Sequence, residues 1–164
     1  MAIDAYQPVV SLVKQAFDLA RTLGIPNLLQ PGLVKEMIIA EILGHEVIPE
    51  KRQPDARDPN DPSAMYEYLS CKEGGTGQLD RMVKSPENDR QDSLDRIRRN
   101  RAIFLAIFYE ANQIRVKTIY KLETDIVLAE AIRKMDRSKN RISHVGFSER
   151  WAKANGFVVY SDQR

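Results

Sequence analysis

The chain has 164 residues, of which 43% are hydrophobic and 29% are charged, enough apolar material for one core and too little length for two ordinary domains. Its 25 Lys and Arg residues nearly balance its 23 Asp and Glu residues, and the net charge of +2 excludes a histone-like polycation and an acidic tail. From this length we expect a single domain over 1–164. A single cysteine and the lack of a secretory pattern at the start favour the reducing cytoplasm, and the lack of an apolar run of about 20 residues argues against a membrane span.

Apolar residues recur at helical spacing near the start of the chain. They predict helices over residues 7–24 and 33–44, each of which ends on a glycine. The pattern then shortens and gains β-branched and aromatic residues, which predicts strand, strand, turn and strand between residues 45 and 71. One further short strand is expected over 78–83, after a glycine-rich break.

The second half of the chain alternates between the two periods. Residues 92–99 and 123–136 predict helices, and 102–110 with 114–122 predict a hairpin whose first strand is buried on both faces. The end of the chain predicts a loop around His144, a short helix over 148–156 and a last strand over 157–160. The expected fold class is therefore α/β, with a mixed central sheet flanked by helices.

The stretch from residue 36 to residue 72 carries the candidate chemistry. Glu36 lies on a predicted helix, Asp55 follows Pro54 near a predicted strand, and Glu67 lies within the next strand. Mg²⁺ takes oxygen ligands, and one or two protein carboxylates together with water and substrate phosphate are enough to hold it. Asp55 and Glu67 are the candidate metal ligands. A metal held there would activate water and neutralise charge in phosphodiester hydrolysis.

This order of acids resembles the PD-(D/E)xK nuclease superfamily, with its restriction-endonuclease-like fold. The resemblance covers about the middle third of the chain and includes the lead-in of helix, glycine and strand and the polar turn between the motif strands. It implies a Mg²⁺-dependent or Mn²⁺-dependent DNA endonuclease that acts on double-stranded DNA as a homodimer. Its implied catalytic residues here are Glu36, Asp55, Glu67 and Lys72.

One position departs from the family's pattern. The family has a lysine two residues after the second acid, where this chain has Leu69. Lys72 is the nearest lysine, but side chains alternate along a strand, so it shares a face with Glu67 only if a bulge or the end of the strand redirects it. Either the lysine has instead migrated to Lys51 or Lys35, or catalysis has been lost.

Each acid also has a structural interpretation. Glu36 is alternatively a solvated helix charge, and Glu41 on the same predicted helix competes for its role. Asp55 is alternatively a turn residue that bonds nearby backbone. Glu67 lies among apolar residues, where an ionised carboxylate needs a partner or an exposed face.

Two basic groups are candidates for contact with the phosphate backbone of DNA. Nearby aspartates weaken both groups, which favours a solvated surface instead. His45 and His144 are expected to be structural, and no other catalytic or nucleotide-binding motif is present. The seven candidate nucleic-acid-binding residues are Arg96, Arg98, Arg99, Arg101, Arg137, Lys139 and Arg141.

The leading hypothesis is thus a metal-dependent endonuclease. The second hypothesis is a catalytically inactive DNA-binding or regulatory module of the same fold, which the missing lysine favours. A small partner-binding protein without nucleic acid is a third possibility.

Overall fold

The computed structural model describes residues 3–163, and the chain divides into two units, residues 1–34 and 35–164, which are described separately. The first unit holds a short 3-10 helix, η1 (Ile3–Tyr6), and the helix α1 (Gln7–Thr22). Its apolar side chains recur at helical spacing, and Leu12 and Leu19 are 65% and 63% exposed. The organisation as one domain over 1–164 stays a prediction.

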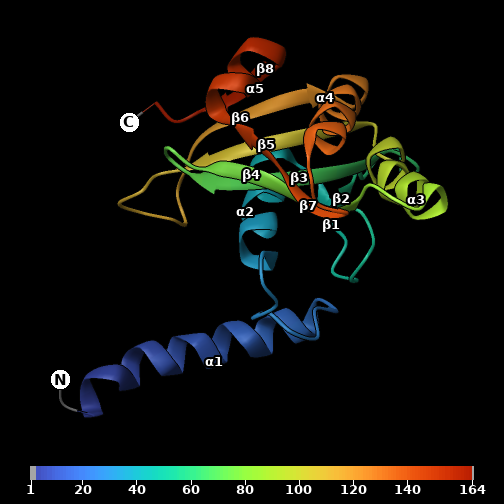
Figure 1. Cartoon of the computed structure of the whole chain (residues 1–164). Helices are drawn as coiled ribbons and strands as arrows, with labels where there is room; N and C mark the ends of the chain where they lie inside the picture. The colour runs from blue at the N-terminus through green and yellow to red at the C-terminus, as the bar shows by residue number, and fades with distance from the viewer. Residues whose placement is uncertain (1–2, 164) are drawn as a thin grey trace. The chain divides into compact units, whose positions relative to one another are not determined.

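The second unit contains a six-stranded mixed sheet in the order β1-β2-β3-β5-β6-β8 (Figure 1). Only β3 and β5 run parallel to each other, and every other neighbouring pair in this sheet is antiparallel. A separate antiparallel pair is formed by β4 and β7. The strands are β1 (Glu46–Val47), β2 (Ala56–Arg57), β3 (Met65–Lys72), β4 (Thr76–Val83), β5 (Ala102–Phe108), β6 (Val116–Glu123), β7 (Ile142–Ser148) and β8 (Phe157–Ser161).

The six-stranded sheet separates two hydrophobic clusters. β5 is buried along its whole length, and its alternating side chains serve both clusters: Leu105 lies in one and Phe104 in the other. The Leu105 cluster is closed by the β4–β7 pair and three helices, whereas Ile39 of the remaining helix packs in the Phe104 cluster. The helices are α2 (Leu33–Leu43), α3 (Glu87–Arg98), α4 (Thr124–Arg137) and α5 (Glu149–Asn155).

The predicted α/β class with a mixed sheet and flanking helices is confirmed. The loop predicted around His144 is wrong, because residues 142–148 form β7 and pair with β4. The helix predicted to begin at residue 92 begins at Glu87, where the acidic residues Glu87 and Asp89 suit the first turn. Within the described residues, no helix combines the length and apolar content that crossing a bilayer requires.

Candidate active site

A cleft of about 700 Å³ opens on the second unit. Its walls come from the segment before β2, from β3, from the middle of β4 and from α3. Charged side chains of both signs dominate these walls, whereas most small-molecule pockets are lined mainly by apolar side chains. The cleft therefore suits a polar or charged ligand. The lining residues are Arg52, Gln53, Asp55, Glu67, Asp80, Arg81, Asp92, Arg96 and Arg99.

Asp55 and Glu67 lie side by side in this cleft because of the register between β2 and β3. Ala56 pairs with Tyr66 in an antiparallel ladder, so the next position brings Asp55 opposite Glu67 on the same face. The main-chain N–H of Asp55 donates to the carbonyl of Tyr66 at 3.0 Å. Asp55 Oδ2 accepts a hydrogen bond of 2.7 Å from the main-chain N–H of Tyr68, which fixes the carboxylate. The structure thus brings together the two acids that the sequence singles out.

Three carboxyl groups at this place have raised pKa values. Burial, reinforced by the charge of Asp55, raises the pKa of Glu67 from 4.5 to about 8. Burial also raises the pKa of Asp55 from 3.8 to about 6, against the opposing effect of the Tyr68 N–H and of Arg99. Glu36 on α2 has its pKa raised to about 7 by burial and by the charge of Asp55, whereas its competitor Glu41 is exposed to solvent. A cation among these groups would lower all three pKa values.

One oxygen of Glu67 has no hydrogen-bond partner. The side chain is 17% exposed, and its Oε2 atom is buried without a hydrogen bond. The nearest cationic atom is Nη2 of Arg99, 4.0 Å away. Within residues 3–163 no three His, Cys, Asp or Glu side chains form a complete metal-binding group. An unsatisfied oxygen beside a second carboxylate nevertheless fits a hard divalent cation that completes its coordination with water and substrate oxygens.

The cations nearest these acids come from α3 and its C-cap. Arg96 and Arg99 both act electrostatically on Asp55 and Glu67 and lower their pKa values. Arg99 Nη1 donates to the carbonyl of Arg52 at 2.9 Å, and Arg96 Nη1 donates to the carbonyl of Asp80 at 3.1 Å. The two guanidinium groups therefore also tie the cleft walls together.

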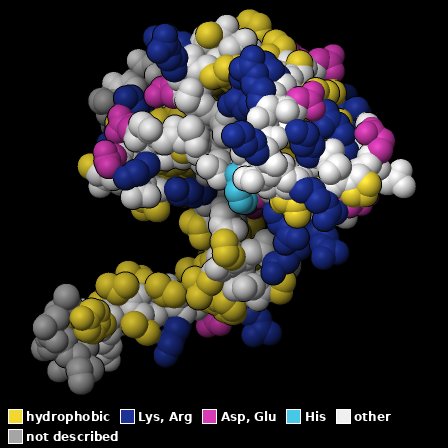
Figure 2. Space-filling model, in the orientation of Figure 1, with side chains coloured by type: hydrophobic (Ala, Val, Ile, Leu, Met, Phe, Trp, Pro, Cys, Tyr) yellow, Lys and Arg dark blue, Asp and Glu magenta, His cyan; other side chains and the backbone are white. Residues whose placement is uncertain are grey.

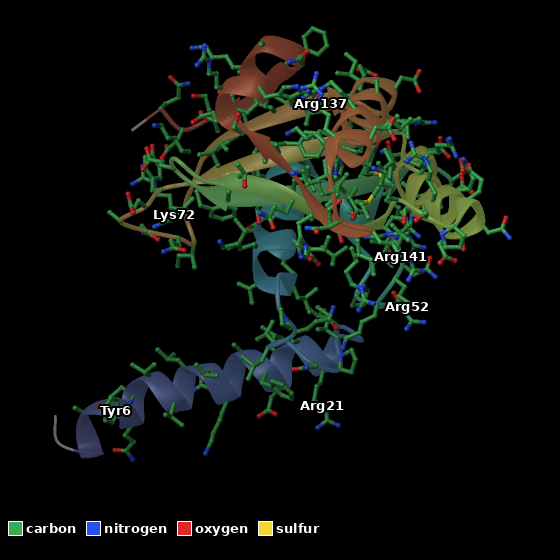
Figure 3. The ribbon with its side chains drawn as sticks, viewed as in Figure 1. Tyr6, Arg21, Arg52, Lys72, Arg137 and Arg141 are labelled. Carbon is green, nitrogen blue, oxygen red and sulfur yellow. The ribbon has the colours of Figure 1, made fainter. Side chains whose placement is uncertain are left out.

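The structure does not bring Lys72 to the acids. It is the last residue of β3, is exposed, and pairs with Glu110 Oε1 at 2.9 Å. Strand alternation places it on the face opposite Glu67, and the register of β3 with β5 runs without a shift from Tyr66 to Lys72. In Figure 3, Lys72 lies far across the sheet from Arg52, which lines the cleft.

The other lysines considered for the catalytic role lie outside the residues that line the cleft. Lys35 lies over the ring of Phe108, with Nζ 4.8 Å from the ring centroid, and Lys51 is exposed. Position 69, where the PD-(D/E)xK pattern would place a lysine, is filled by Leu69, which is 3% exposed within the hydrophobic core.

The predicted nucleic-acid-binding residues separate into two sets. Arg96 and Arg99 line the cleft. Figure 2 shows basic side chains spread widely over the visible side of the second unit. Of the five outside the cleft, three are engaged with acids: Arg98 with Asp95, Arg101 with Asp61 and Arg141 with Asp89. Arg137 and Lys139 are exposed near the end of α4.

Sequence reasoning missed several residues of the cleft. Asp80 and Arg81 lie at a β-bulge in β4, where the register with β7 shifts between Leu79 and Met82. Nothing in the alternation of this short segment indicates a bulge. Arg52, Gln53 and Asp92 were not predicted either; a cluster of basic residues around the motif acids is the signal that would have found Arg52.

The two histidines have protein partners. His45 Nδ1 lies 2.7 Å from the hydroxyl of Tyr68, and its ring stacks on Tyr66. His144 lies on β7 rather than in a loop, with Nδ1 2.8 Å from Asp80 Oδ1. These contacts agree with the structural roles expected of both.

Comparison with known proteins returns no match, either to a protein-family model or to a curated protein.

Proposed function

We propose that the chain is a Mg²⁺-dependent or Mn²⁺-dependent DNA endonuclease with a restriction-endonuclease-like fold. The observation that carries the proposal is the pairing of Asp55 with Glu67 in a charged cleft, where Glu67 Oε2 has no hydrogen-bond partner. Such an arrangement is costly for folding unless a ligand compensates it, and perturbed acids in a cleft are typical of functional sites.

Asp55 and Glu67 would hold the metal, with Glu36 as the outer acid. When bound, a divalent metal lowers the pKa of a coordinated water and neutralises charge on a phosphodiester oxygen. The hydrogen bond from the Tyr68 N–H keeps Asp55 oriented for this role. Burial raises the pKa of Glu36 to about 7 in the metal-free protein, and a bound cation would lower it, which favours the ionised form that can accept a proton.

Arg99 is the best-placed candidate for the cation that stabilises the transition state. Its Nη2 atom is 4.0 Å from Glu67 Oε2, and its other nitrogen is held by the carbonyl of Arg52. A guanidinium so oriented offers several donors to a phosphate that gains charge. In this proposal Arg99 takes the part that the family's pattern gives to the lysine, and Lys72 has none.

Double-stranded DNA is the proposed substrate and a homodimer the proposed working form. Cutting both strands of a duplex requires two sites, and each chain contributes one set of Asp55 and Glu67. The clustered arginines of the cleft supply the electrostatic attraction to a phosphate backbone.

Plasmid cleavage tests the nuclease proposal. We expect the native protein to nick or linearise plasmid DNA with Mg²⁺ or Mn²⁺ and not with EDTA. Asp55→Ala and Glu67→Ala should each lower the rate at least about 100-fold, because removal even of indirect partners of a metal costs about 10- to 100-fold. The exposed Glu41→Ala on α2 is the matched control and should cut normally. Activity that survives both cleft substitutions would remove the proposed site.

The buried Leu69 favours a second function, that of a DNA-binding or regulatory module of the same fold that has lost turnover. This form would bind duplex DNA with a steep salt dependence, would need no divalent metal and would release no product. A gel shift across salt, with and without Mg²⁺, beside the plasmid assay separates the two functions.

A further inference from the structure

Two arginines of the cleft have an unusual backbone conformation. Arg52 has φ +70° and Arg81 has φ +52°, and they are the only residues other than glycine with positive φ in the part of the chain that the structure describes. The left-handed region is unfavourable for a residue with a Cβ atom and is used mainly by Gly, Asn and Asp. Both exceptions are arginines, and both line the same cleft.

The two arginines come from different elements. Arg52 lies in the turn that precedes β2, and Arg81 lies at the bulge of β4, so that no shared local motif explains their common conformation. Bulges redirect side chains next to active sites, and strained backbone persists where the surrounding structure enforces it.

Side-chain hydrogen bonds hold the backbone at Arg52 and directly before Arg81. The carbonyl of Arg52 accepts from Arg99 Nη1 at 2.9 Å, and the carbonyl of Asp80, just before Arg81, accepts from Arg96 Nη1 at 3.1 Å. Arg99 and Arg96 thus hydrogen-bond to the backbone at or next to Arg52 and Arg81.

The guanidinium groups of Arg52 and Arg81 are exposed, and neither makes a hydrogen bond or an ion pair with a described residue. They differ in this from most of the predicted DNA-contacting arginines, which are engaged with carboxylates or main-chain carbonyls. An arginine held in a costly conformation without a partner in its own chain is suited to a ligand, and an anion is the ligand that its fork of donors recognises.

We propose that Arg52 and Arg81 bind phosphates of the DNA backbone that flank the phosphodiester at Asp55 and Glu67. This inference rests on the proposed nuclease function and adds the residues that position its substrate. Phosphate contacts carry no base information, so the two arginines contribute affinity and alignment rather than sequence choice.

The test measures binding of a duplex oligonucleotide by fluorescence anisotropy, in EDTA, across a salt series. The variants are Arg52→Gly, Arg81→Gly, the double Gly variant, Arg52→Lys and Arg81→Lys. Each lost phosphate contact should reduce the slope of log K against log salt by about 0.9, and the double variant should lose about twice that. The Lys variants should keep the slope. Arg57→Ala is the control, because Arg57 lies outside the cleft and pairs with Glu46.

The Gly variants also report on the backbone. Glycine adopts positive φ without steric penalty, so their melting temperatures should equal or exceed that of the native protein. A lower melting temperature would mean that the side chains hold the fold, and it would overturn the assignment. An unchanged slope in both Gly variants, an equal loss in Arg57→Ala or a native protein that does not bind DNA would overturn it as well.

Cleavage measured in parallel separates this inference from the nuclease proposal. A native protein that binds through both arginines but does not cut DNA with Mg²⁺ refutes the nuclease and keeps the phosphate contacts. A protein that cuts with a slope insensitive to both arginines refutes the contacts and keeps the nuclease.

Discussion

The carboxyl group of Glu67 stays largely protonated at neutral pH in the metal-free protein, because burial raises its pKa to about 8. The unfolded chain, in which a glutamate titrates near 4.5, has by then released this proton. The contribution of Glu67 to the free energy of unfolding is therefore fully present below pH 4.5 and is lost as the pH rises to about 8. Asp55 and Glu36, whose pKa values are also raised, act in the same direction.

We expect the metal-free protein to melt at a higher temperature at about pH 5.5 than at about pH 8 in EDTA. The glutamine side chain of the Glu67→Gln variant cannot ionise. This substitution should therefore reduce the difference in the free energy of unfolding between the two pH values by at least about 1 kcal/mol, close to the value of one pKa unit. Thermal unfolding followed by circular dichroism measures the effect, with Glu41→Gln as the control. Identical pH profiles for the native protein and Glu67→Gln would contradict the raised pKa.

The proximity of Asp55 to Glu67 could be predicted from the sequence, whereas the proximity of Arg99 to these two acids could not. Asp55 directly precedes β2 and Glu67 lies on β3, the next strand, so their short separation along the chain indicates that they lie close together. Arg99 is the C-cap of α3, a helix distant in sequence from β3, and it reaches Glu67 only because of how this helix packs. No local pattern encodes that approach.

Elements with strong periodicity were predicted well. The hairpin of β5 and β6 and the helix α4 follow from long apolar runs at period 2 or at helical spacing. β7 was missed because Ile142, Ser143 and His144 at its start mix polar and apolar residues, and Ile142 and His144 are exposed. Its strand character comes from pairing with β4, a contact distant in sequence.

The β4 strand packs closely against the main sheet at Gly77. A Cβ atom at this position would lie 2.5 Å from Leu105 Cδ1 and 2.8 Å from Leu69 Cβ, too close for real side chains. We therefore expect Gly77→Ala to lower the free energy of unfolding by about 1–3 kcal/mol, the usual range for overpacking. Urea denaturation measures it.

Gly146→Ala is the control on the partner strand β7, because its Cβ atom would meet only the Thr76 side chain, at 3.2 Å at the closest. A Gly77→Ala variant as stable as the native protein would show that the two sheets do not approach so closely.

At the scale of the whole molecule, α1 presents an apolar stripe that includes Leu12 and Leu19. Exposed apolar surface of this kind marks interaction sites. The proposed homodimer is expected to sediment at twice the 18.8 kDa of one chain. Charges placed on the stripe by Leu12→Glu with Leu19→Glu should shift the population toward monomer.

Lys14→Glu is the matched control, since it changes the charge of α1 away from the apolar stripe. Sedimentation velocity at several concentrations measures the population. A native protein that sediments as a monomer at every concentration would contradict the homodimer, and an unaltered dimer in the double variant would remove α1 from its interface.

The close approach of Gly77 to Leu69 has a consequence for any attempt to replace Leu69 with lysine. A lysine at position 69 would lie between β3 and β4. These two strands leave no room even for a methyl group at Gly77, which faces Leu69. Such a change would place a charged side chain within the hydrophobic core and spread the two strands apart. The leucine at position 69 is thus held in place by neighbouring packing, and introduction of a lysine there would require several coordinated substitutions rather than one.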